Sequence, residues 1–257
     1  MRMVWYVKAT GSGSALCFNY GNSNDFPVMG DWDGNGVDTP GVVQGNVWNL
    51  DNGYGTAADI VFGFGVATDT FIVGDWDGDG IDTPGVVRGN VWYLKANNNP
   101  NDGTLHVAPF GYGSASDIRI AGDWDGDGDE TPGVVRDVGN SKRWYLNDVA
   151  DSSGADYVFN YGSKDPNPSL DLPTDDLPTA GNWDGSSAGV GNFDTSGIVR
   201  GNDWHLRNLL SGGVAHDLII YGDNFDTPLP IDRDSWPTTE KDTQAVARAS
   251  METTGTC

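Results

Sequence analysis

Repetition is the feature of this sequence that most constrains its fold. A Trp-x-[Leu/Val] segment occurs five times, with successive tryptophans 43, 44, 52 and 60 residues apart. Each segment is followed by an ending in which an aromatic residue precedes glycine, then by an aspartate, and then by a short apolar run. The five tryptophans are Trp5, Trp48, Trp92, Trp144 and Trp204. Repeats of this length bury their apolar surface by stacking on their neighbours, so the pattern predicts five equivalent units.

Each unit is expected to contain four short strands. In the second unit we expect strands at residues 71–74, 85–88, 91–94 and 106–110, which are rich in β-branched and aromatic residues. Glycine, asparagine, aspartate and proline separate these segments, as is usual at turns between strands. Four-stranded units of about 40–50 residues are typical of β-propeller blades. The sequence therefore predicts an all-β protein.

The two ends of the sequence favour a closed ring. The chain begins in a third strand and its last apolar segment, residues 245–248, reads as a second strand. Pairing these ends in one composite blade would hide the sheet edges of an open array. We predict a single five-bladed propeller over residues 1–248, followed by a flexible tail at 249–257. Its repeats are expected at about 5–47, 48–91, 92–143, 144–203 and 204–248.

An acidic, glycine-rich motif follows the first predicted strand of the units. In the second unit it reads Gly-Asp-Trp-Asp-Gly-Asp-Gly, with Asp75, Asp77 and Asp79 at alternate positions. Three carboxylates in such a tight loop repel each other unless a cation lies between them. Calcium takes six to eight oxygen ligands. Near-identical copies at 30–44 and 122–136 favour a cation loop over a plain polar turn, because a turn needs glycine but not three aspartates in register.

Composition excludes some partners. The formal net charge is −23, with only 14 lysines and arginines, so duplex nucleic acid is a poor partner. No apolar run approaches 18 residues, and we expect no membrane span. No signal peptide is visible in this chain. The two cysteines, Cys17 and Cys257, are interpreted either as a buried thiol and a tail residue or as a bridge between the chain ends.

At this point the sequence resembles a known family. The aromatic-glycine ending followed by Asp-x-Asp-Gly-Asp-Gly is similar to the FG-GAP repeats of integrin-α-type calcium-binding propellers, and especially to the bacterial, VCBS-type variants. The resemblance covers about residues 4–248. It implies propeller blades with structural calcium in the loop that joins the first and second strands, and a secreted or cell-surface location. The implied ligands are the side chains of Asp31, Asp33 and Asn35 with the Val37 carbonyl; Asp75, Asp77 and Asp79 with the Ile81 carbonyl; and Asp123, Asp125 and Asp127 with the Asp129 carbonyl.

Three departures from the family pattern bear on these sites. The family loop closes with aspartate at its ninth position, where this chain has Thr39, Thr83 and Thr131. The acid lies one residue earlier, at Asp38, Asp82 and Glu130. Either the acid or the hydroxyl completes the calcium shell, or the acid caps backbone amides instead. The family propellers also have seven blades, whereas this chain has five units.

Two further copies of the motif are degenerate. The fourth has Asn182, Asp184 and Ser186, with an insertion before Asp194, and the fifth keeps only Asp232 and Asp234. We expect weak or no calcium binding in the fourth and none in the fifth. The whole chain is therefore expected to hold about three structural calcium ions.

Other periodic residues have structural interpretations. Tryptophans repeated once per blade are expected to pack between blades rather than to stack on sugars. The arginines that end the second strands are expected to pair with an aspartate of a neighbouring blade or to stack on tryptophan. This set is Arg88, Arg136, Arg200 and Arg248, with Gln44 in the first unit. His106, His205 and His216 lack ligand-like spacing, and no nucleophile elbow, phosphate loop or zinc spacing is present.

These observations predict a non-catalytic, monomeric, extracellular binding module that recognises a glycan or a surface protein. The insertion at 163–175 is expected on the face opposite the calcium loops, and we place the ligand there. Two alternatives stay open. One is a polysaccharide hydrolase or lyase with its site in the central channel, and the other is a structural spacer of a surface protein.

Overall fold

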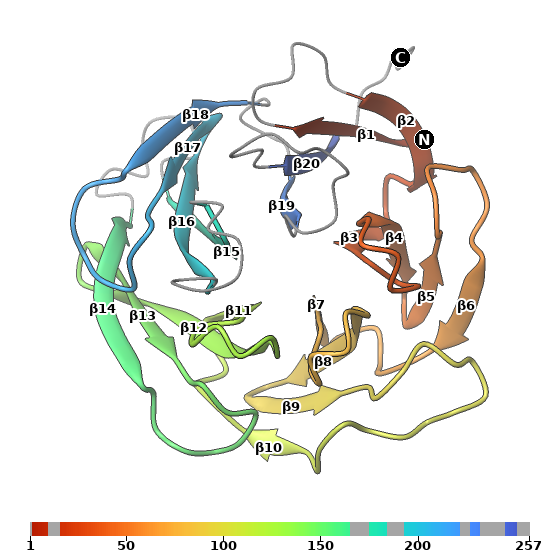
Figure 1. Cartoon of the computed structure of the whole chain (residues 1–257), viewed down its shortest axis with the longest axis horizontal. Helices are drawn as coiled ribbons and strands as arrows, with labels where there is room; N and C mark the ends of the chain where they lie inside the picture. The colour runs from red at the N-terminus through yellow and green to blue at the C-terminus, as the bar shows by residue number, and fades with distance from the viewer. Residues whose placement is uncertain are drawn as a thin grey trace.

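The structure is a computed structural model that describes residues 2–9, 16–164, 175–183, 193–221, 227–231 and 245–250. Within these residues the regular structure consists of strands without helices, which confirms the all-β prediction. The strands form antiparallel sheets set around a central axis, like the blades of a propeller (Figure 1).

Four of the sheets are built from four consecutive strands each. Blade 1 contains β3 (Phe26–Gly30), β4 (Thr39–Gln44), β5 (Val47–Leu50) and β6 (Ile60–Gly63). Blade 2 contains β7 (Thr70–Gly74), β8 (Thr83–Arg88), β9 (Val91–Leu94) and β10 (Phe110–Gly111). Blade 3 contains β11 (Ile118–Gly122), β12 (Thr131–Val138), β13 (Ser141–Leu146) and β14 (Tyr157–Ser163). Blade 4 contains β15 (Leu177–Gly181), β16 (Thr195–Arg200), β17 (Asp203–Leu206) and β18 (Asp217–Ile220).

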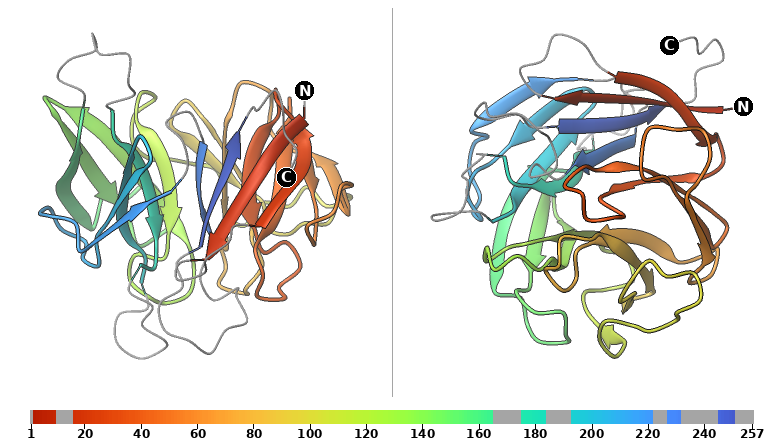
Figure 2. Two further views of the ribbon diagram at one scale, coloured as in Figure 1. Left: turned by 90° about the horizontal axis from the view of Figure 1, so that it is seen from above. Right: turned by 45° about the vertical axis from the view of Figure 1, so that its right-hand side comes forward.

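Strands from both ends of the chain pair in a further sheet. Its order is β19 (Thr227–Ile231), β20 (Ala245–Ser250), β1 (Arg2–Ala9) and β2 (Leu16–Asn22). β1 and β20 are antiparallel, with Val4 opposite Ser250 and Ala9 opposite Ala245 (Figure 2). The strands nearest the axis contact one another in turn, from β3 to β7, β11, β15, β19 and back to β3.

One predicted strand of blade 2 is wrong in its bounds. The segment 106–110 was expected to be the fourth strand, but the ladder with β9 contains only Phe110 and Gly111. Pro109 directly precedes this pair, and proline cannot donate a ladder hydrogen bond. The chain between β9 and β10 instead forms a long loop.

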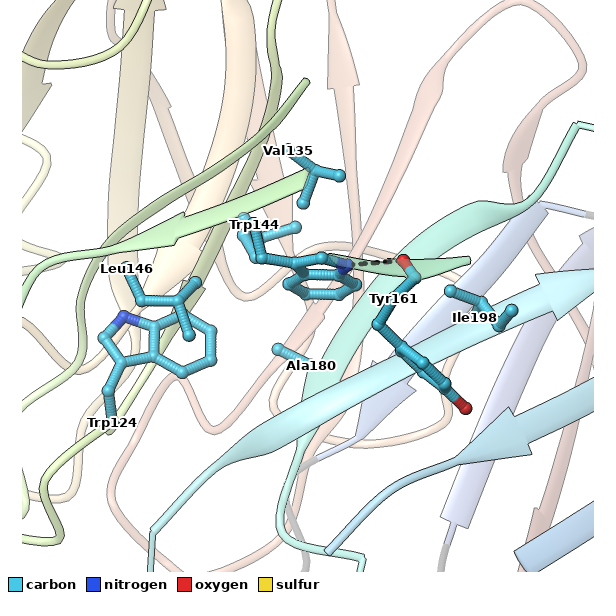
Figure 3. Close-up of a cluster of buried hydrophobic side chains, with 8 residues drawn as sticks. Trp124, Val135, Trp144, Leu146, Tyr161, Ala180 and Ile198 are labelled. Atoms are coloured by element: carbon cyan, nitrogen blue, oxygen red, sulfur yellow. Dashed lines mark hydrogen bonds between the residues drawn. The ribbon is translucent and has the colours of Figure 1, made fainter. Parts of the chain in front are cut away.

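The tryptophans form the core of the blades. All nine that the structure describes are at most 3% exposed, which confirms their packing role, and Trp236 lies outside the described residues. In blade 3, Trp144 donates its indole N–H to the Tyr161 carbonyl at 2.8 Å (Figure 3). Trp124, from the acidic loop, donates to the Thr131 carbonyl at 3.2 Å. Each tryptophan thus buries a large apolar ring while satisfying its single donor.

Neighbouring blades share these cores. Tyr161 at the end of β14 packs with Ile198 and Ala180 of blade 4 in the same cluster as Trp144 (Figure 3). Its hydroxyl donates to the His205 carbonyl of β17 at 3.0 Å. Tyr20 of β2 makes the equivalent bond to the Asn49 carbonyl of β5, also at 3.0 Å. In both cases the tyrosine of one sheet is hydrogen-bonded to the third strand of the next sheet.

Glycine in the second strands leaves room for the loop tryptophans. A Cβ added at Gly85 would lie 2.7 Å from Ile72 Cγ2 and 3.0 Å from Trp76 Cζ2. Gly41, Gly133 and Gly197 occupy equivalent crowded positions. Even a methyl group at this position would overpack the blade.

We predict that Gly85→Ala lowers the free energy of unfolding by about 1–3 kcal/mol, because the added methyl group forces Ile72 or Trp76 to move. Urea unfolding followed by tryptophan fluorescence measures the loss. Gly103→Ala is the matched control, since a Cβ there meets no atom within 4 Å. Equal stability of the two variants would contradict the packing role assigned to Gly85.

Candidate metal centre

The acidic motifs form the loops between the first and second strands of the blades. We call residues 30–38, 74–82 and 122–130 loops 1, 2 and 3. The two glycines inside each loop have positive φ angles, for example 69° at Gly78 and 83° at Gly80. The equivalent pairs, Gly34 with Gly36 and Gly126 with Gly128, are also left-handed. This backbone, which glycine adopts without strain, folds the loop tightly around its aspartates.

The first aspartate of each loop organises the loop backbone. Asp31 accepts hydrogen bonds from the amides of Gly34 at 2.9 Å and Gly36 at 2.6 Å. Asp75 accepts from Asp79 and Gly80, at 3.1 and 2.7 Å. Asp123 accepts from Gly126 and Gly128, at 2.7 and 3.1 Å. The carboxylate therefore occupies the centre of the turn in all three loops.

The predicted carboxylate triads come together. Asp75, Asp77 and Asp79 each offer an oxygen within 4.8 Å of the others, and Asp123, Asp125 and Asp127 do the same. The second and third acids of each triad are exposed, which leaves them accessible to a cation. In loop 1, Asn35 replaces the third acid and is also exposed. A donor set made only of oxygen fits a hard divalent cation such as calcium.

Electrostatics in the loops also favour a cation. Burial raises the pKa of Asp75, as do the charges of Asp79 and Asp77, although the amides of Gly80 and Asp79 oppose the shift. Burial likewise raises the pKa of Asp123, with the charges of Asp127 and Asp125 adding to it. In loop 3, burial and the neighbouring Asp127 raise the pKa of Asp129 to about 7. Negative charge on Asp75, Asp123 and Asp129 is thus disfavoured in the bare loops, and a bound cation would stabilise it.

The residues predicted to offer carbonyl ligands lie where each loop approaches its second strand.

Neighbouring acidic loops also contact one another, loop 1 with loop 2 and loop 2 with loop 3. A Cβ at Gly34 of loop 1 would lie 2.9 Å from Ile81 Cγ1 of loop 2. A Cβ at Gly78 would lie 3.3 Å from the Gly128 carbonyl of loop 3. Val37 and Asp129 are partly buried. The loops therefore pack against one another around the axis.

The acid that directly precedes the threonine of a second strand reaches the loop of the preceding blade in three cases, Asp82, Glu130 and Asp194. Asp82 accepts a hydrogen bond from the Asp31 amide at 2.8 Å, and its own amide donates to the Asp31 carbonyl at 2.8 Å. The Glu130 amide donates to the Asp75 carbonyl at 2.7 Å. Asp194 exchanges the same two bonds with Asp123, at 3.1 and 2.5 Å. Of the alternatives left open for Asp38, Asp82 and Glu130, capping of a backbone amide describes Asp82, but the amide belongs to another blade. Asp194 caps the Asp123 amide in the same way.

The ninth-position threonines point their hydroxyl groups at backbone carbonyls. Thr39 donates to the Gly30 carbonyl at 3.4 Å and Thr131 to the Gly122 carbonyl at 3.4 Å. Thr83 donates to the Lys95 carbonyl at 2.7 Å. Asp38, the last residue of loop 1, is buried at 4% exposure.

Some predicted sites lie outside the described residues. These are Asp184 and Ser186 of the fourth motif, Asp232 and Asp234 of the fifth, Cys257, residues 165–174 of the insertion, and residues 251–257 of the predicted tail. Asn182 is described and follows β15 directly. The weak and lost calcium loops, and the bridge between Cys17 and Cys257, stay predictions.

The predicted partners of Arg88, Arg136 and Arg200 are wrong, and the side chain of Arg248 lies outside the described part of the structure. Arg88 makes a bidentate pair with Asp69 at 2.8 and 2.9 Å, within its own blade. Arg136 pairs with Asp117, and Arg200 with Asp176, in the same way. The aspartate directly precedes the first strand, and the arginine lies at the sixth residue of the antiparallel second strand, so the register brings them together. Arg88 and Arg136 lie over Tyr93 and Tyr145 rather than over tryptophan.

Two cavities lie along the axis. One, of about 260 Å³, is lined by the inner strands, with apolar residues such as Phe71 and Ile120. The other, of about 330 Å³, is lined by the acidic loops. The residues common to both are Asp38, Asp82, Glu130 and Asp194. One acid from each of the four blades therefore borders both cavities.

Sequence reasoning missed a bridge between loops 1 and 2. Asn98 donates to the Trp32 carbonyl at 3.1 Å and to the Asp82 carbonyl at 2.8 Å. Its loop is folded around the buried Lys95, whose ammonium donates to the carbonyls of Asn99 and Asp102 at 3.2 and 2.9 Å. The length of this loop was visible in the sequence, but no local signal identifies the role of Asn98.

The three histidines do not form a second candidate site with either axial cavity. His106, His205 and His216 are absent from the lining of both described cavities. His216 Nδ1 accepts a hydrogen bond from the Asn208 amide at 2.9 Å. In the part of the chain that the structure covers, no helix is long and apolar enough to span a membrane.

Comparison of the chain with models of protein families, with curated proteins and with solved structures gave no match.

The Asp69–Arg88 pair predicts a specific pH dependence. The hydrogen bond from Arg88 lowers the pKa of Asp69 below its ordinary value, so the pair stabilises the fold above that value, near 3.9, and loses its contribution as the pH falls through the lowered pKa. Arg88→Met should therefore be less stable than the parent at pH 5.5, and the difference should shrink towards pH 3. Urea unfolding at a series of pH values measures it.

Arg143→Met is the control for the previous experiment, because Arg143 bonds the neutral side chain of Asn160 instead of a carboxylate. Its stability relative to the parent should not change between pH 5.5 and pH 3. A pH-independent difference for Arg88→Met would contradict the role given to the Asp69–Arg88 pair.

Proposed function

We propose that this chain is a calcium-stabilised, five-bladed β-propeller of the FG-GAP type, acting as an extracellular binding module for a glycan or a surface protein. The observation that carries the calcium part is the convergence of Asp75, Asp77 and Asp79, and of Asp123, Asp125 and Asp127, within 4.8 Å. Loop 1 shares their fold, with Asn35 in place of the third acid. In this proposal each of the three loops holds one structural ion.

We infer that the sheet formed by both chain ends acts as the fifth blade. Its strand order, β19-β20-β1-β2, continues the order seen within the four consecutive blades. β19 contacts both β15 and β3, which is the place that an innermost strand of a fifth blade would take. Closure of this kind satisfies the edge strands that an open array would leave exposed.

A modest calcium affinity would be sufficient for this role. Extracellular calcium modules commonly bind with dissociation constants of about 10⁻⁴–10⁻³ M. An ion in such a loop would tie the first and second strands of a blade together and offset part of the net charge of −23. A secreted or cell-surface location and a monomeric state belong to the same proposal.

The ligand part of the proposal rests on surface loops. All nine described tryptophans are buried, so they do not offer exposed faces for sugar rings. We place the ligand on the face opposite the calcium loops, where the insertion at 163–175 joins blades 3 and 4. Similar loops on several blades would allow repeated weak contacts and a gain in avidity.

The polysaccharide hydrolase or lyase has one supporting observation. The axial cavity of about 260 Å³ could admit part of a sugar chain, and Asp82 and Glu130 lie on its wall. These acids are, however, part of the loop contacts between blades. The two axial cavities count against a spacer without any concave site.

Calcium should raise the melting temperature, because a ligand that binds only the folded state stabilises it by mass action. We expect a higher melting temperature in 5 mM calcium than in excess EGTA. The double variant Asp77→Asn/Asp125→Asn should lose most of that difference, because each substitution removes a charged ligand from one triad. Thermal unfolding followed by circular dichroism measures it.

Asp217→Asn is the control for removal of a carboxylate charge elsewhere, since Asp217 is exposed on β18, outside the acidic loops. It should keep the full calcium-dependent shift. Identical melting of the parent protein in calcium and in EGTA would contradict structural calcium.

A glycan array tests the ligand. We expect binding in millimolar calcium that is lost in EGTA, because the propeller presents its loops correctly only when folded. Deletion of residues 165–174 should abolish this binding without changing the calcium-dependent melting. A blank array with folded protein would contradict the glycan and favour a protein ligand.

A further inference from the structure

We propose that Asp82, Glu130 and Asp194, the acids that directly precede a second strand, are positioning residues for the calcium site of the preceding blade, not ligands in their own loops. The inference rests on the proposed calcium function and assigns its residues across blades. Asp82 would serve loop 1, Glu130 would serve loop 2 and Asp194 would serve loop 3.

The contact between Asp82 and Asp31 shows the arrangement. Asp82 lies 51 residues after Asp31, yet it holds both backbone groups of that residue: its carboxylate accepts from the amide, and its amide donates to the carbonyl, each at 2.8 Å. The Asp31 side chain in turn receives the loop amides of Gly34 and Gly36. Loop 1 is therefore built on a residue whose backbone is held by blade 2.

Asp194 makes the same pair of bonds at its boundary, and Glu130 makes the bond from its backbone amide. Asp194 holds both backbone groups of Asp123, and the Glu130 amide donates to the Asp75 carbonyl. The glycine before each first aspartate makes room for the neighbouring acid. A Cβ at Gly122 would lie 2.9 Å from Asp194 Oδ2, and one at Gly74 would lie 2.5 Å from Glu130 Oε2.

Asp194 distinguishes most clearly between a positioning role in the preceding blade and a ligand role in its own loop. Its own loop is degenerate, with Asn182 as the first residue of the motif and Ser186 at the fifth position. An acid retained there has little use as a local calcium ligand. The contact with Asp123 accounts for it, because loop 3 has a complete aspartate triad and needs Asp194 from blade 4.

The two assignments predict opposite results for Glu130. If Glu130 is a ligand in its own loop, its loss weakens the site of loop 3. If its carboxylate, which lies beside Gly74, positions Asp75, removal of the carboxylate weakens the site of loop 2. Two single-site proteins separate these outcomes. Asp33→Asn with Asp77→Asn leaves only loop 3 intact, and Asp33→Asn with Asp125→Asn leaves only loop 2 intact.

The measurement is calcium affinity, obtained by competition with terbium. Trp76 in loop 2 and Trp124 in loop 3 lie between the first two aspartates of their triads, so excitation of the tryptophan reports a bound terbium ion. Residues that orient metal ligands typically change affinity by about 10–100-fold when removed. In the loop 3 protein, Asp194→Ala should weaken calcium binding at least about tenfold, and Glu130→Ala should leave it within about twofold.

The loop 2 protein should show the reverse. There Glu130→Ala should weaken binding at least about tenfold, and Asp194→Ala should have no effect beyond about twofold. Weakening of loop 3 by Glu130→Ala would overturn the proposal in favour of a local ligand. Equal weakening of calcium binding at both sites would also overturn the proposal, because it would indicate a general loss of stability. Unchanged calcium binding at both sites would overturn it as well, because the acids would then have no positioning role.

A conservative variant tests whether the acid acts by accepting a hydrogen bond. Asp194→Asn keeps a side-chain oxygen that can accept from the Asp123 amide, so it should restore most of the affinity lost in Asp194→Ala. If Asp194→Ala does not fold, Asp194→Glu takes its place. It keeps the charge but displaces the acceptor, and it must weaken loop 3 without weakening loop 2.

Discussion

Backbone hydrogen bonds between neighbouring acidic loops are the contacts on which this structure depends near its axis. Asp31, Asp75 and Asp123 each begin a loop, and each has its carbonyl bonded to the amide of an acid in the following blade. Such bonds satisfy backbone groups that would otherwise be buried without partners. Because the first aspartate also folds its own loop, the arrangement of blades and the shape of each candidate calcium site are fixed together.

Farther from the axis, aromatic packing holds the blades. The buried tryptophans of the third strands, with tyrosines such as Tyr161, form cores that extend from one sheet to the next. Each of these aromatic residues contributes apolar burial, and the indole N–H of the third-strand tryptophans bonds a backbone carbonyl. The charged loops lie at one end of these cores, and the left-handed glycines of each loop bring its acids close together. A cation would relieve the repulsion that this approach creates.

Much of the fold follows from local sequence. Trp144 and Leu146 show the two-residue alternation of a half-buried strand, and the left-handed Gly78 and Gly80 mark the tight acidic turn. The triad of Asp75, Asp77 and Asp79 was predictable for the same reason, because five consecutive residues carry it. Interactions across strands or blades were not. Asp69 pairs with Arg88 of its own blade, and Asp82 reaches Asp31, because strand register and blade stacking set these contacts and no sequence spacing encodes them.

The most direct test of the account is the number of calcium ions bound per chain. Equilibrium dialysis of the metal-free protein against millimolar calcium, followed by atomic absorption, gives that number. The account predicts three ions for the parent protein and one for each of the two single-site proteins. Absence of bound calcium in the folded parent protein would contradict it, because the carboxylate triads would then be stable without a cation.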